Sequence, residues 1–188
     1  MKKIFFYTFF VLLFNGCSVT DIIEDVDEHY TKEKASKAYG DFCSREALAI
    51  CNDSVLVEDD TLATMDDIIV YTYDFMRRGV NYTYIYDSLQ FGSDEYYFYM
   101  TPRDDGIMYG DCEDWTITFI ENNIRNGNIQ KGEARWVLGF QEETIHAWTI
   151  ITKNGVEYLF DNRIPHGMLK ADAYTRNSYK EIKTIYSY

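Results

Sequence analysis

The chain has 188 residues, with 31 acidic and 18 basic side chains, and a formal net charge of −13 at pH 7. This charge argues against nucleic acid or anionic lipid headgroups as a binding partner, and it permits divalent cations. Aromatic residues make up 17% of the chain and no segment is low in complexity, so most of it is expected to fold as one domain around one core.

The N-terminal residues 1–16 are typical of a secretory signal peptide. Lys2 and Lys3 precede eleven mostly apolar residues, 4–14, a stretch too short for a bilayer, which takes about 20. Gly16-Cys17 resembles a lipoprotein cleavage site, where cleavage before the cysteine is followed by attachment of lipid to it. The sequence therefore predicts an exported protein with a lipid anchor at Cys17. The alternative is an ordinary signal peptide in which Cys17 is incidental.

Residues 17–34 are acidic and polar, and we interpret them as a tether. Such a segment would hold the domain that follows, residues 35–188, away from a membrane. The expected location is the periplasmic or cell-surface face of a membrane, which the protein would contact through its lipid.

Helical patterns come first within this domain. Residues 35–51 are expected to form a helix, and so are residues near 65–78. At the second helix, Thr64 and Asp67 have the spacing of a capping box, and Gly79 follows as a stop signal. This helix would bury a set of apolar side chains: Ile68, Ile69, Phe75 and Met76.

Two cysteines in this region, Cys43 and Cys51, are candidates for a disulfide in an oxidising compartment. A continuous helix over 41–51 would separate them by about 12 Å, which is beyond disulfide reach. Their pairing is therefore left open. In either case Cys112 is the cysteine without an obvious partner.

The second half of the chain changes from helix to strand. Tyrosines at alternate positions over 82–86 indicate an extended segment, and a helix begins near Cys112 and runs through 115–125. Beyond the Asn126-Gly127 stop, strands are expected at 133–140, 145–153 and 156–161. Helices followed by strands, without βαβ alternation, indicate an α+β fold with an antiparallel sheet.

Cys112 is the first candidate for chemistry. At the start of a helix, unpaired backbone N–H groups and the helix dipole favour a thiolate, which is the reactive form of a cysteine nucleophile. The alternative is a small buried residue that begins the helix and has no chemical role.

The expected hairpin adds two partners. Asn154-Gly155 is a strong signal for a two-residue turn, and this turn fixes the register of the strands on either side. Counting from it by twos places His146 and Asp161 on the same face as diagonal neighbours, about 7–8 Å apart at the backbone, so their side chains can meet. This is the arrangement of a general base and the carboxylate that orients it. His166, after Pro165, is a rival base that suits a loop better.

These residues together resemble the bacterial transglutaminase-like cysteine proteinases, whose best-known members are periplasmic proteases that trim large biofilm adhesins. The resemblance covers roughly residues 65–165 and rests on four segments in this order: Tyr96 to Pro102, Gly110-Asp-Cys-Glu-Asp114, His146-Ala147 and Leu159-Phe-Asp-Asn162.

The resemblance implies a catalytic role for each of three residues. Cys112 would be the nucleophile of a cysteine endopeptidase, His146 the general base, and Asp161 the residue that orients it. The implied fold is a papain-like, transglutaminase-like core, in which N-terminal helices, the cysteine-bearing helix among them, pack on a C-terminal antiparallel sheet. The backbone N–H of Cys112 would contribute to an oxyanion hole.

The resemblance also implies a calcium ion. Asp111, Glu113 and Asp114 crowd Cys112, and neighbouring carboxylates disfavour a thiolate. Asp111 and Glu113 match positions that hold Ca²⁺ beside the active site of the adhesin-trimming relatives, and oxygen ligands suit that ion. The alternative is that these acids only cap the helix and complement its dipole.

Three functions remain open at this point. The first is hydrolysis of a peptide bond in an exported or surface protein. The second is amide transfer or hydrolysis on a non-peptide substrate by the same three residues. The third is a non-enzymatic surface lipoprotein that kept the fold for binding.

Overall fold

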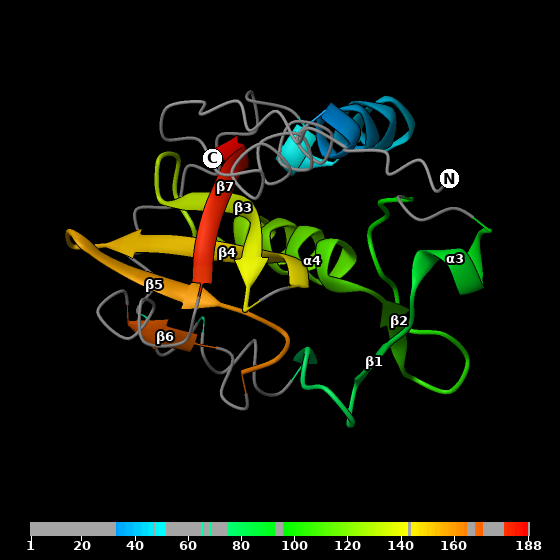
Figure 1. The fold of residues 1–188 in the computed structure, drawn as a ribbon. Coiled ribbons are helices and arrows are strands. Elements are labelled where there is room, and N and C mark those ends of the chain that lie inside the picture. Colours follow the sequence, from blue (N-terminus) through cyan, green and yellow to red (C-terminus); the bar gives the residue numbers. More distant parts are fainter. Residues whose placement is uncertain are drawn as a thin grey trace, which may run out of the picture.

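We describe the fold from a computed structural model (Figure 1). It describes residues 33–46, 48–51, 65, 68, 75–92, 96–142, 144–164, 168–170 and 179–187. The expectations for the signal peptide, for lipid at Cys17, for most of the tether and for His166 lie outside these ranges. Among the described residues, no helix is both long enough and apolar enough to cross a membrane.

The centre of the molecule is a curled, five-stranded antiparallel sheet with the order β6-β5-β4-β3-β7 (Figure 1). The expected strands are present to within one residue at either end, and two more flank them. The strands are β3 (Ala134–Gln141), β4 (Thr144–Lys153), β5 (Val156–Phe160), β6 (Met168–Lys170) and β7 (Tyr179–Ser187). The fold is therefore mixed helix and antiparallel sheet, in agreement with the α+β expectation.

Helix α4 (Cys112–Arg125) packs against β3 and β4, and all its residues from Cys112 to Glu121 are buried. It ends as expected, with Asn126 as C-cap and Gly127 at a φ of 71°. Side chains of β4 alternate between two clusters, because successive residues of a strand point to opposite faces. Ala147 and Ile151 join the core that includes α4, while Trp148 and Ile150 join a second cluster.

A short parallel pair leads into α4. Strand β1 (Tyr82–Tyr84) confirms the expected extended segment, and it pairs in parallel with β2 (Met108–Gly110), which ends directly before α4. The sequence pattern did not indicate this pair, nor the one-turn helix α3 (Asp87–Gln90) between its strands. The segment that follows α3 is held by side chains: Asp87, Asp114 and Thr118 accept the backbone N–H groups of Tyr96, Phe98 and Met100, respectively.

The expected single helix over 35–51 is wrong. The described residues are helical from 33 to 45, and a separate 3-10 turn, η1 (Ala49–Cys51), follows. This break brings the Cα atoms of Cys43 and Cys51 to 5.3 Å, and the two cysteines form a disulfide.

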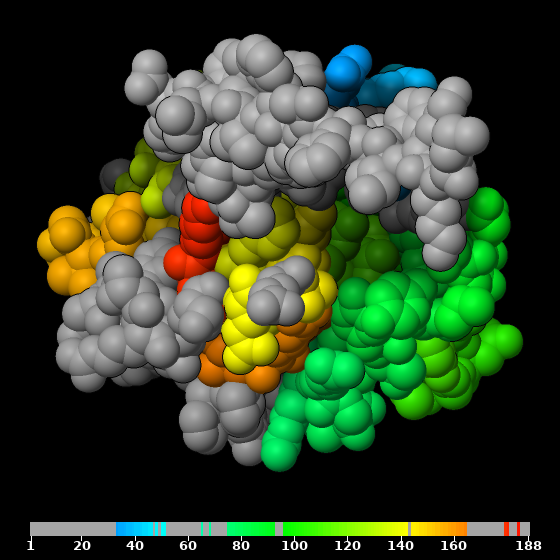
Figure 2. All heavy atoms as spheres, in the orientation of Figure 1, coloured from blue at the N-terminus to red at the C-terminus, as the bar shows by residue number. Residues whose placement is uncertain are grey.

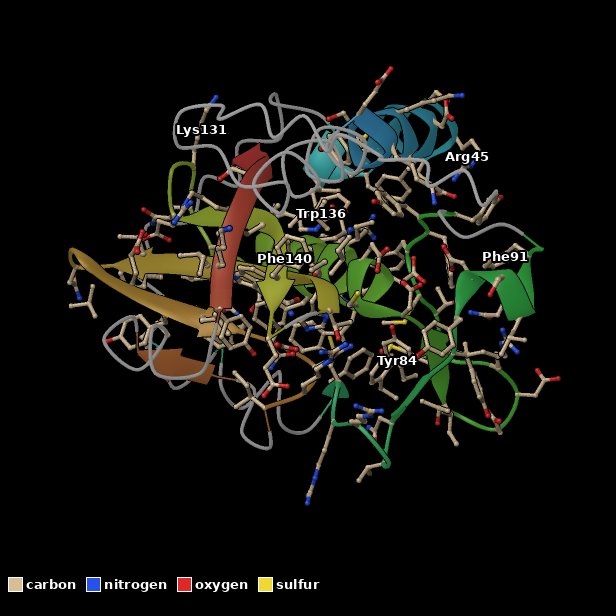
Figure 3. All side chains as sticks on the ribbon, viewed as in Figure 1. Arg45, Tyr84, Phe91, Lys131, Trp136 and Phe140 are labelled. Atoms are coloured by element: carbon tan, nitrogen blue, oxygen red, sulfur yellow. A yellow bond between two sulfur atoms is a disulfide. The ribbon has the colours of Figure 1, made fainter. Side chains whose placement is uncertain are left out.

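The disulfide segment packs on the central helix and the sheet. The backbone N–H of Ile50 donates to Glu121 Oε2 of α4 at 2.8 Å, and Tyr39 places its ring edge-on against Trp136 at 5.3 Å. Figure 3 shows Trp136 on β3, beneath the N-terminal helix. The N-terminal region therefore covers the side of the core to which α4 belongs.

The helix predicted near 65–78 lies largely outside the described residues. Residues 65, 68 and 75 are helical, and residues 76–78 are not, so the helix ends earlier than expected. Ile68 and Met76 are buried as predicted, whereas Phe75 is 39% exposed because it lies at the last helical position. Ile69 is outside the described residues.

Candidate active site

The start of α4 is built around a close backbone approach. Asp111 is the N-cap and forms a capping box with Asp114, whose Oδ2 accepts the backbone N–H of Asp111 at 3.1 Å. Gly110 is required here, because a Cβ atom at that position would lie 2.7 Å from the Met100 sulfur and 2.8 Å from Asp114. The first turn of the helix therefore holds Cys112, as expected, among three acidic side chains.

Cys112 is buried and protonated in this arrangement. Its sulfur donates to Glu113 Oε2 at 2.8 Å. Burial, followed by the charges of Glu113 and Asp111, raises the pKa of the Cys112 thiol well above its usual value. A backbone hydrogen bond from Ala147 acts in the opposite direction and lowers it. The crowding of carboxylates anticipated from the sequence is thus present, and it works against a thiolate.

The hairpin supplies the second part of the site with the predicted register. Lys153 pairs with Val156 across the turn, and the register continues to Thr149 opposite Phe160. His146 and Asp161 meet as expected, with His146 Nε2 at 2.8 Å from Asp161 Oδ1. Both side chains are fully buried, and the backbone N–H of Arg163 also donates to Asp161 Oδ1 at 2.8 Å.

The two parts meet at an open edge of β4. Pairing between β5 and β4 ends at Thr149, so β4 has no β5 partner on that side before this residue. The start of α4 occupies this edge, as the hydrogen bond from the Ala147 backbone to the Cys112 sulfur shows. Cys112 thus lies beside Ala147, the residue that follows His146. His146 Nδ1 is buried and has no hydrogen-bond partner among the described residues.

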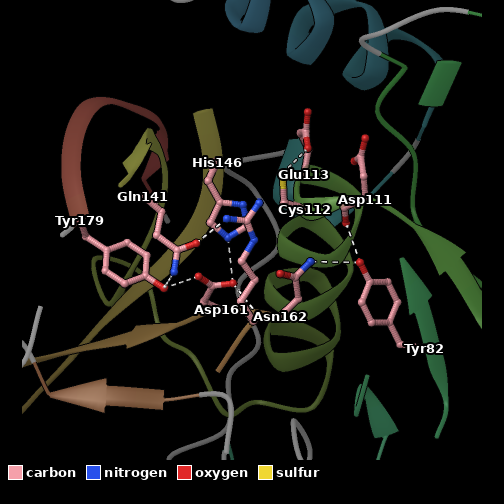
Figure 4. Close-up of polar contacts among 10 residues, drawn as sticks. Tyr82, Asp111, Cys112, Glu113, Gln141, His146, Asp161, Asn162 and Tyr179 are labelled. Carbon is pink, nitrogen blue, oxygen red and sulfur yellow. Dashed lines mark hydrogen bonds and ion pairs between the residues drawn. The ribbon is translucent and has the colours of Figure 1, made fainter. Parts of the chain in front are cut away.

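Two residues that sequence reasoning missed connect the parts. Asn162 Nδ2 donates to the Tyr82 hydroxyl at 3.0 Å, and this hydroxyl lies 3.1 Å from the Gly110 carbonyl oxygen and 3.2 Å from that of Asp111. Burial raises the pKa of Tyr82 well above its usual value, so the phenol stays neutral. Figure 4 shows this bridge between β1 and the residue after Asp161. The alternating tyrosines indicated a strand, but nothing in their spacing indicated this contact.

The structure brings together more carboxylates than the sequence motif contained. Asp87, Asp111 and Asp114 are buried and offer ligand atoms within 4.8 Å of one another, as do Asp111, Cys112 and Glu113. Asp111 Oδ1 has no hydrogen-bond partner among the described residues. Burial raises the pKa of Asp111, and burial with the charges of Asp111 and Asp87 raises that of Asp114 well above its usual value. Oxygen donors of this kind suit Ca²⁺.

The surface beside the site carries exposed apolar side chains. Figure 2 shows the β3–β4 turn (yellow) next to the segment with β1 and α3 (green). Ile145, directly before His146, is 42% exposed, and Tyr86 is 61% exposed. Tyr84 is half-buried, and burial is the main cause that raises the pKa of its phenol.

The arrangement contains a thiol at the start of a helix and an imidazole with one nitrogen bonded to a carboxylate and the other without a hydrogen-bond partner among the described residues. Such a set can support nucleophilic attack with general base assistance. No family model and no curated protein matches this chain.

Proposed function

We propose that this protein is a cysteine peptidase with a papain-like, transglutaminase-like core, which hydrolyses a peptide bond in an exported or surface protein. The observation that carries the proposal is the state of His146. Asp161 holds its Nε2, and its Nδ1 is buried without a partner among the described residues, on the strand edge where Cys112 lies. A buried imidazole nitrogen left without a hydrogen bond is costly, and a catalytic role explains why it is kept.

In the proposed reaction, the Cys112 thiol transfers its proton to His146 Nδ1, and the sulfur attacks the carbonyl carbon of the scissile bond. The imidazolium then gives the proton to the leaving amine, which departs as the thioester forms. Water hydrolyses the thioester, with His146 again as base. Cys112 is the first residue of α4, so its N–H is one of the donors that a helix leaves free for a developing oxyanion.

We further propose that Ca²⁺ binds at the start of α4. Asp87, Asp111 and Asp114 fit the ion better than the pair Asp111 and Glu113 expected from the sequence, because Glu113 is engaged with the Cys112 thiol. When bound, the cation would offset the negative charge that raises the pKa of Cys112. Glu113 is a further ligand if its carboxylate turns away from the sulfur.

The hydrogen bond between Cys112 and Glu113 is the observation that favours the non-enzymatic alternative. A thiol whose proton is held by a carboxylate is a poor nucleophile. Alkylation with iodoacetamide at neutral pH, in the presence of calcium, separates the two readings. If the protein is an enzyme, Cys112 should be labelled rapidly. If it is a binding protein, Cys112 should be labelled slowly, like an inert buried cysteine. Cys43 and Cys51 form a disulfide and would not compete.

The peptidase function itself is tested by comparing the protein fragments released from the surface of cells that produce either the natural chain or Cys112→Ser. Fragments that depend on Cys112 would identify the substrate and its cleavage site. A matched control is the double variant Cys43→Ser/Cys51→Ser, which removes the two other described cysteines and leaves Cys112 in place. An identical set of fragments from the natural chain and Cys112→Ser contradicts the proposal.

The proposed location is the periplasmic or cell-surface face of a membrane, with lipid on Cys17. Mass spectrometry of the mature protein would show a lipid-modified Cys17 as its first residue. An unmodified N-terminus beyond Cys17 contradicts the anchor without affecting the peptidase proposal.

A further inference from the structure

Asp161 has a second hydrogen-bond partner from the far edge of the sheet. The hydroxyl of Tyr179, the first residue of β7, is bonded to Asp161 Oδ2. The other oxygen, Oδ1, faces His146 Nε2. The ring of Tyr179 packs edge-on against Trp148 at 5.1 Å, and Trp148 lies against His146 at 6.3 Å. Tyr179 therefore contacts both the carboxylate and the aromatic residue next to the histidine.

The direction of this hydrogen bond follows from two further contacts. Arg163 Nη1 lies 2.5 Å from Gln141 Oε1, and since a guanidinium can only donate, this contact fixes the amide orientation of Gln141. Gln141 Nε2 then donates to the Tyr179 hydroxyl oxygen at 3.0 Å. The hydroxyl proton is thus left for Asp161. Figure 4 shows this chain of contacts from Gln141 through Tyr179 to Asp161.

The same reasoning extends to the histidine. Tyr179 donates to one oxygen of Asp161, and the backbone N–H of Arg163 donates to the other. A carboxylate that receives these donors is held as an acceptor, so His146 must carry its proton on Nε2 to bond with it. When the ring is neutral, its lone pair is then on Nδ1, the nitrogen without a hydrogen-bond partner among the described residues.

We propose that Tyr179, supported by Gln141 and Arg163, is a positioning residue that sets the tautomer of His146 through Asp161. This inference rests on the proposed function for its kinetic consequence, but the tautomer itself is a property of the resting protein. Burial and the charge of Asp161 raise the pKa of the Tyr179 phenol, which keeps its proton in place.

The test is Tyr179→Phe, which keeps the ring packed on Trp148 and removes only the hydroxyl. Nitrogen NMR of the imidazole is the first readout, and the chain has only 3 histidines to assign. We expect an unprotonated Nδ1 and a protonated Nε2 in the natural protein, and a mixture of tautomers or a shifted equilibrium in the variant. With a substrate identified, kcat should fall roughly ten- to a hundredfold, the usual effect of one hydrogen bond to a charged group, while KM changes little.

Gln141→Glu provides a second variant of almost the same size. It replaces the amide donor by an acceptor, which draws the Tyr179 proton away from Asp161, so the spectrum of His146 should change in the same direction. Gln141→Glu also tests the inference if Tyr179→Phe does not fold. Tyr99→Phe is the matched control, because it removes a tyrosine hydroxyl bonded to Asn122 at 2.6 Å, at the other end of α4. It should change neither the spectrum nor kcat.

An unchanged His146 spectrum in both Tyr179→Phe and Gln141→Glu overturns the inference, even if the protein proves to be a peptidase. Failure of the proposed function alone would give a different result. A shifted tautomer in a protein that cleaves no substrate and alkylates slowly supports the positioning role and contradicts the proposed function.

Discussion

The two parts of the candidate site are both buried and polar, but they differ in how their charges are satisfied. In the hairpin part, Asp161 faces donors at each oxygen: His146 and Arg163 at one, Tyr179 at the other. At the start of α4, burial and then the acidic side chains around Cys112 raise the pKa of its thiol, and Asp111 Oδ1 has no hydrogen-bond partner among the described residues. The first part is organised by hydrogen bonds within the chain, and for the second we propose a cation in addition to the backbone N–H groups that its carboxylates accept.

The largest expected effect is the loss of turnover when Asp161 in the hairpin part is replaced by a side chain of the same shape without its charge. In Asp161→Asn, the amide can no longer hold His146 in the same tautomer, and turnover should fall by up to about 10⁴-fold, the loss known for this change in a Ser-His-Asp triad. Circular dichroism and the melting temperature should confirm a folded protein. Turnover within tenfold of the natural chain would show that the hairpin part does not act as proposed.

The α4 part should respond to calcium. An ion that binds only the folded chain at a concentration of 100 times its Kd stabilises it by about 2.7 kcal/mol, which corresponds to roughly 5–10 °C for a domain of this size. A chelator should reverse this gain and lower turnover. Asp87→Asn should weaken both effects, because it removes a carboxylate from the cluster. If calorimetry shows the same melting temperature with calcium and with chelator, the carboxylates only cap and brace the helix.

A third region calibrates the comparison, because its hydrogen bond to α4 is made at Glu121 and not in the first turn of the helix. The disulfide closes a loop with a sequence separation of 8, and its removal in Cys43→Ser/Cys51→Ser should cost roughly 2–3 kcal/mol in the free energy of unfolding. Denaturant unfolding measures this loss. The calcium response and the turnover of the folded fraction should stay as in the natural chain, and a loss of the calcium response would mean that the α4 start depends on the N-terminal region.

The smallest expected effect is a difference in pH dependence. Burial raises the folded-state pKa of Asp111 and Asp114, so the folded chain binds protons more tightly than the unfolded chain. With chelator, stability should therefore decrease as pH rises above about 4, by up to about 1.4 kcal/mol per pH unit for each such group. With calcium, which favours the ionised carboxylates, the slope should be smaller or reversed. Parallel slopes in the two conditions would contradict a cation at this cluster.

Features fixed by local pattern were predictable from the sequence. The turn signal Asn154-Gly155 determined the register of β4 and β5, and from it the meeting of His146 with Asp161. The helix that begins near Cys112 followed from helical spacing over 115–125, and the structure adds a capping box at its start. In each case the residues that decide the structure are neighbours in the chain or across one turn.

Features that depend on distant segments were not predictable in the same way. Asp87 joins the carboxylates of α4 through the parallel β1–β2 pair, and Tyr179 reaches Asp161 because β7 pairs with β3. The helix over 35–51 was mispredicted because a disulfide between Cys43 and Cys51 overrides helical propensity at its end. No periodicity within a segment reports contacts of this kind.

The position of Tyr179 has a consequence for the order in which the site matures. A ribosome makes the chain from its N-terminus, so α4 and the β4–β5 hairpin are complete before β7 is synthesised. Until β7 pairs along β3, Asp161 Oδ2 lacks the hydroxyl that bonds to it in the finished fold. The nascent chain can thus carry its cysteine, histidine and aspartate without a fixed tautomer. Under the proposed function, the pairing of β7 along β3 would be the step that completes the site.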